Sequence, residues 1–361
     1  MAANANLHKA KNEKNDEFYT QLTDVANELK HYRQHFAGKT VFCNCDDPTW
    51  SAFWKYFHLN FSVLGLKKLI STHYDKNEPT YKMEYEGGDD DNIEAGVKTP
   101  LEGNGDFRNQ ECLDLLDECD IVVTNPPFSL FREYVKTLME HGKKFIIIGN
   151  QNAITYKETF PLIMNDEMRI GSQKGCISLF FEVPDDYVVP DSARKYCECH
   201  LGKEYCAEHH MTYMRTACWF TNLDIQKHHE RLVLWKEYTP ENYSQYDNYN
   251  AINVDKTSEI PKDYDGIMGV PITFLYQYSP DQFEIIGMGC GWNGNSPLVT
   301  QTYDGEQHQI NKDGSVITVG KLNDGTPLIK LDVPPTGMSY YEVNGHYYIR
   351  TYGRILIRRR V

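Results

Sequence analysis

In the first 165 residues, short and continuously apolar runs alternate with amphipathic stretches. Four apolar runs predict buried strands, namely Lys39–Cys45, Lys68–Thr72, Asp120–Thr124 and Phe145–Gly149. Between them, apolar side chains at helical spacing predict helices over Leu22–Phe36, Trp50–Phe61, Gln110–Glu118 and Leu130–His141. The acidic, aperiodic stretch Asp75–Gly105 predicts a loop or an irregular insert. Strands that alternate with helices predict an α/β fold with a doubly wound, mostly parallel sheet.

After about residue 166 the pattern changes to short strand-like runs. They are Ile177–Val183, Ala217–Thr221, Leu232–Tyr238, Ile272–Tyr276 and Phe283–Met288. Two turn sequences predict hairpins: Asn323-Asp324-Gly325 between Ile317–Leu322 and Leu328–Leu331, and Asn344-Gly345 between Tyr340–Val343 and His346–Arg350. We therefore expect an α/β domain over residues 1–165. Residues 166–361 are expected to hold the remainder of its core and a β-rich region.

The length and composition are those of an ordinary globular protein. A chain of 361 residues fits two domains. No run approaches the roughly 20 apolar residues of a membrane span, and Met1–Asn15 lacks the apolar core of a secretory signal. We therefore expect a cytoplasmic protein that does not bind membranes. The net charge of −14 is the wrong sign for a generic nucleic-acid binder, although a binding face can be basic within an acidic chain.

The sharpest motif is Asn125-Pro126-Pro127-Phe128, which directly follows the predicted strand Asp120–Thr124. It resembles the catalytic signature of S-adenosylmethionine-dependent amino-group methyltransferases. An exocyclic amine is a poor nucleophile because its lone pair is delocalised into the ring. The Asn125 side-chain oxygen and the Pro126 carbonyl can hold both of its N–H groups, while the prolines keep these acceptors fixed. Phe128 offers a flat face for an extruded base. The alternative is a plain turn that closes a strand.

Further segments accompany this motif in a consistent order along the chain. They read NDEFYT at 15–20, VFCNCDDPTWSAFWKYF at 41–57, GDFR at 105–108, WFTNLD at 219–224 and GVPITF at 269–274. Together with Asn125–Phe128 they closely resemble the EcoRI-type adenine-specific DNA methyltransferase family, from about Asn15 to Arg358.

This resemblance implies a Rossmann-like enzyme that methylates the N6 amino group of adenine in double-stranded DNA by base flipping and direct in-line transfer. Residues 1–165 would bind S-adenosylmethionine and carry catalysis, and the later region would recognise the target. Phe18, Tyr19 and Thr20 would pack over the methionine end of the cofactor, and Asp106 and Phe107 would contact its adenine. We expect a monomer, with a cognate restriction endonuclease as a functional but not physical partner.

The turn after the first predicted strand departs from the usual pattern. Methyltransferases commonly have a glycine-rich turn there, but Cys43–Pro48 contains no glycine. We still expect Cys45, Asp46 and Asp47 beside the cofactor, with one aspartate near its ribose or its methionine amine. Both aspartates could also simply cap the helix that begins near Thr49, which is compatible with the first interpretation.

A second candidate site combines cysteines with histidines. Cys197, Cys199, Cys206 and His209 could supply four tetrahedral zinc ligands. Their spacing is not that of a standard zinc knuckle, and the resemblance implies no zinc there. The alternative is a polar surface insert. The other cysteines that we single out are expected to be buried apolar residues, namely Cys43, Cys112, Cys119, Cys176, Cys218 and Cys290.

Other functions remain compatible with the motif alone. Cytosine N4 in DNA, adenine in RNA and a protein glutamine all present a similar planar amine, and a non-catalytic relative could retain the fold. Basic residues after about residue 220 are expected to contact DNA phosphates. Candidates are found in the tail, namely Arg350, Arg354, Arg358, Arg359 and Arg360, although the tail could instead just end a strand.

Overall fold

A computed structural model describes residues 19–75, 79–173, 177–183 and 187–360 of the chain. The chain divides into two compact units. The first comprises Met1–Ala153 with Asp166–Ile225, and the second Ile154–Asn165 with Gln226–Val361. The assignment of catalysis to residues 1–165 and of target recognition to residues 166–361 concerns roles and stays a prediction.

Within the described residues, the first unit is built on a ten-stranded sheet. Its centre is parallel, in the order β3-β2-β6-β7, with β2 at Thr40–Cys43, β3 at Lys68–His73, β6 at Ile121–Thr124 and β7 at Lys144–Asn150. Antiparallel strands extend both flanks. They are β10 (Met211–Thr221), β9 (Ile177–Glu182), β1 (Tyr19–Thr20) and β8 (Arg169–Ile170) beyond β7, and β4 (Tyr81–Tyr85) and β5 (Val97–Pro100) beyond β3.

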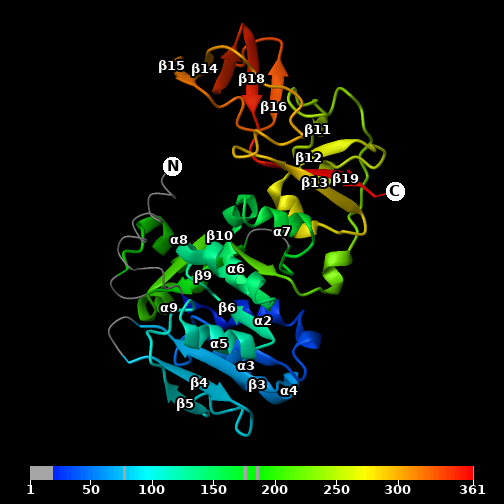
Figure 1. The fold of residues 1–361 in the computed structure, drawn as a ribbon. Coiled ribbons are helices and arrows are strands. Elements are labelled where there is room, and N and C mark those ends of the chain that lie inside the picture. Colours follow the sequence, from blue (N-terminus) through cyan, green and yellow to red (C-terminus); the bar gives the residue numbers. More distant parts are fainter. Residues whose placement is uncertain (1–18, 76–78, 174–176, 184–186, 361) are drawn as a thin grey trace. The chain divides into compact units, whose positions relative to one another are not determined.

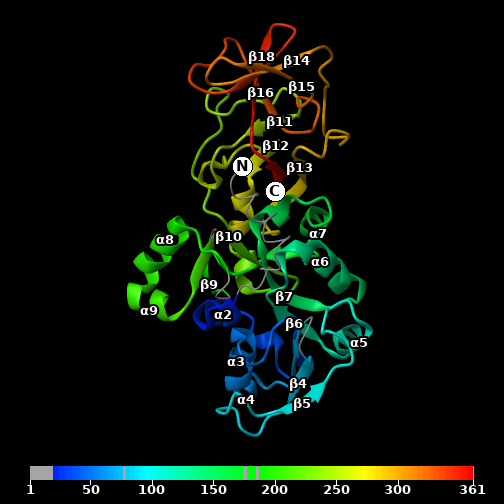
Figure 2. The ribbon, with the colours of Figure 1, turned by 90° about the vertical axis from the view of Figure 1, so that its left-hand side faces the viewer.

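Helices cover both faces of this sheet (Figure 2). Helices α2 (Leu22–Leu29), α3 (Ala52–Leu59) and α4 (Phe61–Leu64) lie on one side, and α5 (Gln110–Glu118) and α6 (Phe131–Glu140) on the other. Two neighbouring residues of β10 show that its side chains alternate between the two faces of the sheet. Trp219 meets Phe53 of α3 at 5.9 Å between ring centroids, and Phe220 meets Phe131 of α6 at 5.1 Å. Because successive side chains point to opposite faces, one apolar strand serves two cores.

The predicted elements of the first unit are largely confirmed. Helix α5 spans Gln110–Glu118 as predicted, and all four predicted parallel strands form. The predicted helix Leu22–Phe36 instead ends at Leu29, before a short 3₁₀ turn at Arg33–His35. The prediction of a loop over Asp75–Gly105 is wrong, because β4 and β5 pair there. The remaining helices of this unit are η2 (Phe128–Leu130), α8 (Asp191–Leu201) and α9 (Lys203–Glu208).

The second unit is rich in β-structure and contains two sheets in its described residues (Figure 1). One has the order β11-β12-β19-β13, with strands Ala251–Asn253, Ile267–Pro271, Arg354–Arg359 and Phe283–Gly289. The other has the order β15-β14-β17-β18-β16, with strands Val316–Val319, Gln307–Ile310, Tyr340–Val343, His346–Arg350 and Leu328–Leu331. Its helical elements are α7 (Phe160–Met164) and 3₁₀ turns at Gln226–His229, Thr257–Glu259 and Ile272–Gln277, while η3 (Gln151–Thr155) crosses the unit boundary.

Turn chemistry predicts one of the two late hairpins correctly. Strands β17 and β18 pair around Asn344 and Gly345, whose φ angles of 50° and 76° are those of a tight hairpin turn. The other predicted hairpin is wrong, since β15 pairs with β14 and β16 pairs with β18. Ile272–Tyr276 lies in a 3₁₀ helix, and no strand is assigned within 232–238. The molecule is thus mixed α/β with a β-rich C-terminal region, as expected.

No helix in the described part of the chain combines the length and the apolarity that a membrane crossing requires.

Candidate active site

The carboxyl ends of the four parallel strands meet at one edge of the first sheet. In open α/β sheets, this edge is where ligands bind. The segments that leave the strands there are Asn44–Asp47 after β2, Tyr74-Asp75 after β3, Asn125–Phe128 after β6 and Gln151 after β7. The sheet therefore brings two of the segments predicted from sequence, at 45–47 and 125–128, to the same edge.

The Asn125–Phe128 segment directly follows β6 and leads into the short helix η2. Thr124, the last residue of the strand, is fully buried, and the side-chain oxygen of Asn125 is shielded from solvent. Phe128 is partly buried and its ring meets the ring of Phe181 of β9 edge-on, at 6.5 Å between centroids. The segment is thus a fixed turn whose aromatic side chain packs at the sheet surface.

The N-terminal segment Tyr19-Thr20 lies near the Asn125–Phe128 turn. Tyr19 and Thr20 form β1, which pairs with β9 so that Thr20 lies opposite Phe181, the partner of Phe128. Phe18 lies outside the described residues. Four residues after β1, burial raises the pKa of the Asp24 carboxyl to about 6. The structure therefore brings the end of the NDEFYT segment beside the Asn125–Phe128 segment.

Cys45 takes the conformation that a glycine would ordinarily supply. Its φ is +64°, in the left-handed region that few residues other than glycine occupy. The turn after β2 therefore has a tight backbone despite its lack of glycine. Burial raises the pKa of the Cys45 thiol well above its usual range, so the thiol is neutral.

Asp46 points back into the protein. Its Oδ2 is hydrogen-bonded to the hydroxyl of Thr124 and accepts, at 3.3 Å, from the backbone N–H of Asn125. Its Oδ1 accepts from Ser51 Oγ at 3.1 Å. Burial raises the pKa of the Asp46 carboxyl to about 7, against the opposing effect of these hydrogen bonds. This side chain thus connects the turn after β2 with the turn after β6.

Asp47 has the opposite electrostatic character. Burial alone would raise its pKa, but hydrogen bonds from His73, Thr49 and Tyr81 hold it well below the usual range. The His73 Nδ1 and Tyr81 hydroxyl lie 3.0 and 2.9 Å from its oxygens. Asp47 also accepts from the Thr49 backbone, whereas the cap of α3 is Ser51. Asp47 is therefore a fixed anion at the sheet edge, and neither aspartate is the helix cap.

Asp106 and Phe107 have internal partners. Arg108 binds both oxygens of Asp106, with Nε–Oδ1 at 2.8 Å and Nη2–Oδ2 at 2.6 Å. Phe107 is buried and meets the ring of Tyr134 edge-on at 4.9 Å. The Arg108 backbone N–H also donates to Asp106 Oδ1, at 3.0 Å.

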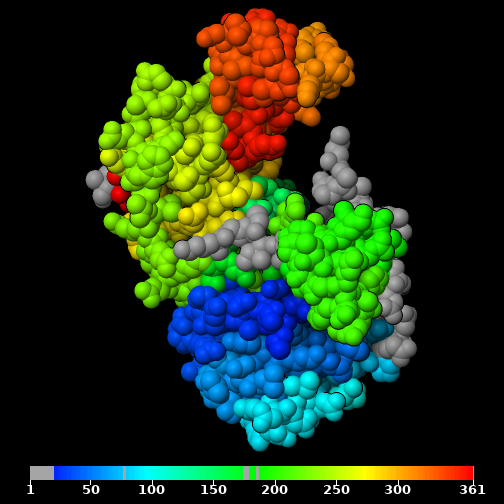
Figure 3. Space-filling model, turned by 180° about the vertical axis from the view of Figure 1, so that it is seen from behind, coloured from blue at the N-terminus to red at the C-terminus, as the bar shows by residue number. Residues whose placement is uncertain are grey.

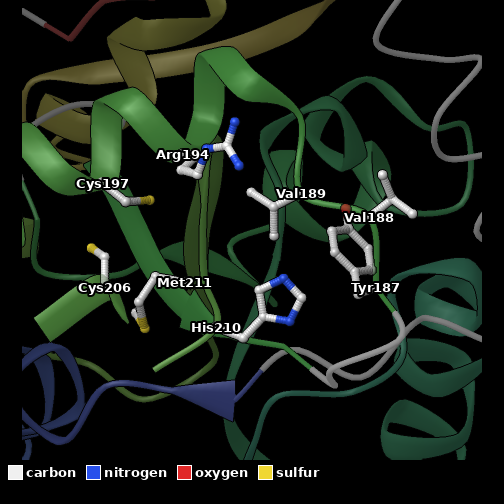
Figure 4. A pocket seen from close by; sticks show the side chains of 8 residues that line it. All are labelled: Tyr187, Val188, Val189, Arg194, Cys197, Cys206, His210 and Met211. Carbon is white, nitrogen blue, oxygen red and sulfur yellow. The ribbon is translucent and has the colours of Figure 1, made fainter. Parts of the chain in front are cut away.

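The four predicted zinc ligands Cys197, Cys199, Cys206 and His209 do not face one common point. Cys197 and Cys199 are two residues apart on α8, so they face different sides, one buried and the other exposed. Figure 4 shows Cys197 and Cys206 around a pocket that Cys199 does not line. His209 Nδ1 lies 3.3 Å from Glu182. Among the described residues no three His, Cys, Asp or Glu side chains surround a common point, so the expectation of zinc is not supported.

Helices α8 and α9 form instead a compact surface element beside α2, shown in green and dark blue in Figure 3. The Tyr205 hydroxyl donates to Gln21 Oε1 at 2.9 Å across this contact. Of the cysteines expected to be buried, Cys43, Cys112, Cys119, Cys218 and Cys290 are so, and Cys176 lies outside the described residues.

The arginines of the tail divide into two kinds. Arg350 pairs with Asp324, and Arg354 is buried, with its Nε 3.3 Å from Asn253 Oδ1. Both therefore hold the second unit together. Arg359 is partly buried, with its Nη1 4.0 Å from Asp265 Oδ1. Arg358 and Arg360 are exposed, and the Nε of Arg360 donates to the Phe283 carbonyl at 3.2 Å. The contacts of these arginines with DNA phosphates stay a prediction.

Sequence reasoning missed the polar residues that organise this edge. They lie at the ends of their strands and helices, with Ser51 before α3 and Tyr81 at the start of β4: Ser51, Ser71, Thr72, His73, Tyr81 and Thr124. One signal was available, because Ser71-Thr72-His73 places three polar side chains at the end of an otherwise apolar strand. The partnership of Asp46 with Thr124, 78 residues apart, had no signal in the sequence.

Comparison with known proteins gives consistent matches. Residues 6–360 match the family described as "Adenine-specific methyltransferase EcoRI". The chain is 45% identical over 299 residues to the type II methyltransferase M.EcoRI of Escherichia coli, covering 79% of this chain and 89% of that protein. It is 36% identical to M.MgeORF184P of Mycoplasma genitalium (78% and 85% covered) and to M.MpnI of Mycoplasma pneumoniae (78% and 84%), both also type II methyltransferases. No solved structure matches.

Proposed function

The chain belongs to the EcoRI family of adenine-specific methyltransferases, and from that premise we propose that it methylates the N6 amino group of adenine in a specific double-stranded DNA sequence. The methyl donor is S-adenosylmethionine, and the base is flipped out of the helix for direct in-line transfer. The enzyme acts as a monomer and protects its recognition sequence against a restriction endonuclease that it does not bind.

One observation carries this proposal. Asn125–Phe128 leaves the central parallel strand β6 at the edge where ligands bind in such sheets, next to the turn after β2. The Asn125 side-chain oxygen and the Pro126 carbonyl accept the two N–H groups of the target amine, which localises its lone pair. Pro127 stiffens the turn, and Phe128 stacks on the flipped base.

The residues at the sheet edge fit S-adenosylmethionine, which supplies an electrophilic methyl group. The left-handed backbone at Cys45 keeps the turn after β2 tight, as glycine does in other enzymes of this kind. Asp47 is ionised at neutral pH and can accept from hydroxyl or ammonium groups. We assign Cys45, Asp47, Asp106 and Phe107 to the walls of this site, together with Phe18, Tyr19 and Thr20, and treat Asp46 separately because its carboxyl is turned towards Ser51, Thr124 and Asn125.

The parallel order β3-β2-β6-β7, with helices on both faces, supports a Rossmann-like methyltransferase fold. The alternatives are other planar amines, in cytosine, RNA or protein glutamine, or binding without catalysis. No contact in the described residues favours any of them, and the family match favours adenine.

Transfer of a labelled methyl group decides between these functions. The purified protein is incubated with labelled S-adenosylmethionine and DNA, RNA or protein, and methylated bases are then mapped in DNA from cells that express it. We expect N6-methyladenine within one recurring DNA sequence. Label found only in RNA, protein or cytosine would overturn the proposal, and cofactor binding without any transfer would indicate a binding protein.

A further inference from the structure

The turn after β2 and the turn after β6 are joined by one buried side chain, Asp46. We propose that the Asp46 carboxyl is a positioning residue that holds the Asn125 turn in its catalytic conformation, and that it is not a ligand of the cofactor. This inference rests on the proposed function, because it assigns Asn125 to the target amine. It replaces the sequence-based expectation that Asp46 faces the cofactor's ribose or methionine amine.

The partners of the Asp46 carboxyl carry the inference. Three groups of the protein itself approach the carboxyl: Thr124 Oγ1 and the Asn125 N–H at Oδ2, and Ser51 Oγ at Oδ1. Thr124 and Asn125 are consecutive residues, at the end of β6 and the start of the catalytic turn. Ser51 is also the cap of α3, where its hydroxyl accepts from two backbone N–H groups. Asp46 therefore fixes the catalytic turn to both β2 and α3.

The count of protons around Thr124 strengthens the assignment. Its hydroxyl lies within hydrogen-bond reach of two oxygens, the Asn44 carbonyl and the Asp46 carboxyl, but has only one proton to donate. All the contacts are satisfied when Asp46 itself holds a proton and donates it to Thr124, which then donates to Asn44. Burial favours this neutral form by raising the pKa of Asp46 to about 7.

The surroundings of Asp46 explain why its proton is retained. The neighbouring charge is that of Asp47, which also raises the pKa of Asp46. The other titratable groups that interact with it are Cys43, Cys45 and Tyr134, and burial raises the pKa of each well above its ordinary value. These groups are therefore neutral near pH 7, so none of them offsets the charge that Asp46 would gain on ionisation.

The turn after β2 does not depend on this carboxyl. Ser71 Oγ donates to the backbone carbonyl of Asp46, and Thr72 Oγ1 donates to Asn44 Oδ1 at 3.1 Å. Asp47 has its own partners, His73 and Tyr81. Loss of the Asp46 carboxyl should therefore release Asn125 while leaving the backbone near the cofactor in place.

The first test compares two substitutions at Asp46. We expect Asp46→Ala to lower kcat on DNA by about 100-fold, because a small misplacement of a catalytic group costs about that much. The dissociation constant for S-adenosylmethionine, measured by calorimetry, should stay within about threefold of the wild-type value. Asp46→Asn should have an activity between those of the wild type and Asp46→Ala, since its amide can donate to Thr124 and accept from Ser51, but its NH2 group cannot accept from the Asn125 N–H. Hydrogen exchange of the backbone around Asn125 should be faster in Asp46→Ala than in either other protein.

The second test leaves Asp46 unchanged. Thr124→Val preserves shape but removes the hydroxyl, and Thr124→Ser keeps it. We expect Thr124→Val to lower kcat without weakening cofactor binding, and Thr124→Ser to behave as the wild type. This pair decides the matter if Asp46→Ala does not fold. Unchanged kcat in Thr124→Val overturns the inference, as does an Asp46→Ala variant that loses cofactor affinity while its kcat is unchanged.

Failure of the proposed function gives a different result. In that case neither the wild type nor any variant methylates DNA, while the exchange measurement still reports the link between Asp46 and Asn125. If instead the wild type is active, Asn125→Ala is inactive and Asp46→Ala equals the wild type, the function stands and the positioning role of Asp46 is wrong.

Discussion

Asn125 tests the proposed chemistry at the scale of one side chain. We expect Asn125→Ala to lower kcat by roughly 100- to 1,000-fold, the usual cost of one preorganised acceptor or donor lost from a transition state. Cofactor affinity and thermal stability should change little, because Asn125 lies in a turn and not in the apolar core. Single-turnover methylation of DNA measures the rate of methyl transfer, and calorimetry measures cofactor affinity and thermal stability.

Phe128→Ala provides a matched control within the same turn. Loss of a stacking surface costs about 1–3 kcal/mol per base, so this variant should weaken productive binding of DNA more than it slows the transfer step. Near-wild-type turnover in Asn125→Ala would show that the segment is only a structural turn.

Asp46 also predicts a pH dependence of stability. Its pKa rises from 3.8 in the unfolded chain to about 7 in the folded protein, mainly through burial. The folded state therefore binds more protons between these values. The stability that this group contributes is complete below about pH 4 and is lost as the pH rises through 7, with a slope of up to about 1.4 kcal/mol per pH unit.

Asp46→Asn removes this titration. Urea unfolding at a series of pH values from about 4 to 8 should show a smaller decline of the free energy of unfolding for the variant than for the wild type. Asp24, whose pKa is also raised, titrates in both proteins and cancels in the difference. Parallel pH profiles would mean that Asp46 is ionised throughout this range.

At the scale of elements, the first unit was largely predictable because its strands are buried on both faces and read as continuous apolar runs. The β4–β5 pair was missed because β5 is the edge strand of the sheet and both strands are only partly buried, so charged and polar residues are tolerated and the apolar signal is weak. In the second unit, Ile272–Tyr276 resembles a strand, but its buried aromatic residues Phe274 and Tyr276 pack as a 3₁₀ helix. Local pattern cannot distinguish these outcomes for so short a run.

Helix α2 predicts a stability effect at this scale. Glu28 is fully buried on it, and its carboxylate accepts from Tyr32 at 2.9 Å and from both the backbone and the hydroxyl of Ser172, next to β8. Glu28→Ala leaves these donors without their acceptor, so we expect a loss of about 3 kcal/mol in the free energy of unfolding.

The matched control is Tyr32→Phe, which removes only one of these hydrogen bonds and keeps the ring. It should cost about 1–3 kcal/mol, the range for leaving a buried hydrogen-bonding group without its partner. Urea denaturation measures both variants. A Glu28→Ala protein as stable as the wild type would mean that the helix is held by its apolar face alone.

At the scale of the whole molecule, an acidic chain has to bind a polyanion. The net charge of −14 opposes DNA at long range, so binding depends on local basic surface. Arg350 and Arg354 cannot supply it freely because they pair with Asp324 and Asn253. Arg358 and Arg360 are exposed, although the Nε of Arg360 also donates to the Phe283 carbonyl. Sequence reasoning located this basic tail, but could not tell which arginines fold inward, since that depends on partners about 25 to 100 residues away.

The salt dependence of DNA binding tests this surface. Each phosphate contact contributes about 0.9 to the slope of log K against log salt concentration. We expect Arg358→Gln and Arg360→Gln each to reduce the slope by about 1 and to weaken binding to specific and nonspecific DNA alike. Arg358→Lys, which keeps the charge, should retain the wild-type slope, and this control separates charge from packing. Because slope and affinity are measured on the same titration, a variant that loses affinity at an unchanged slope would show that Arg358 supports the fold and that the phosphates lie elsewhere.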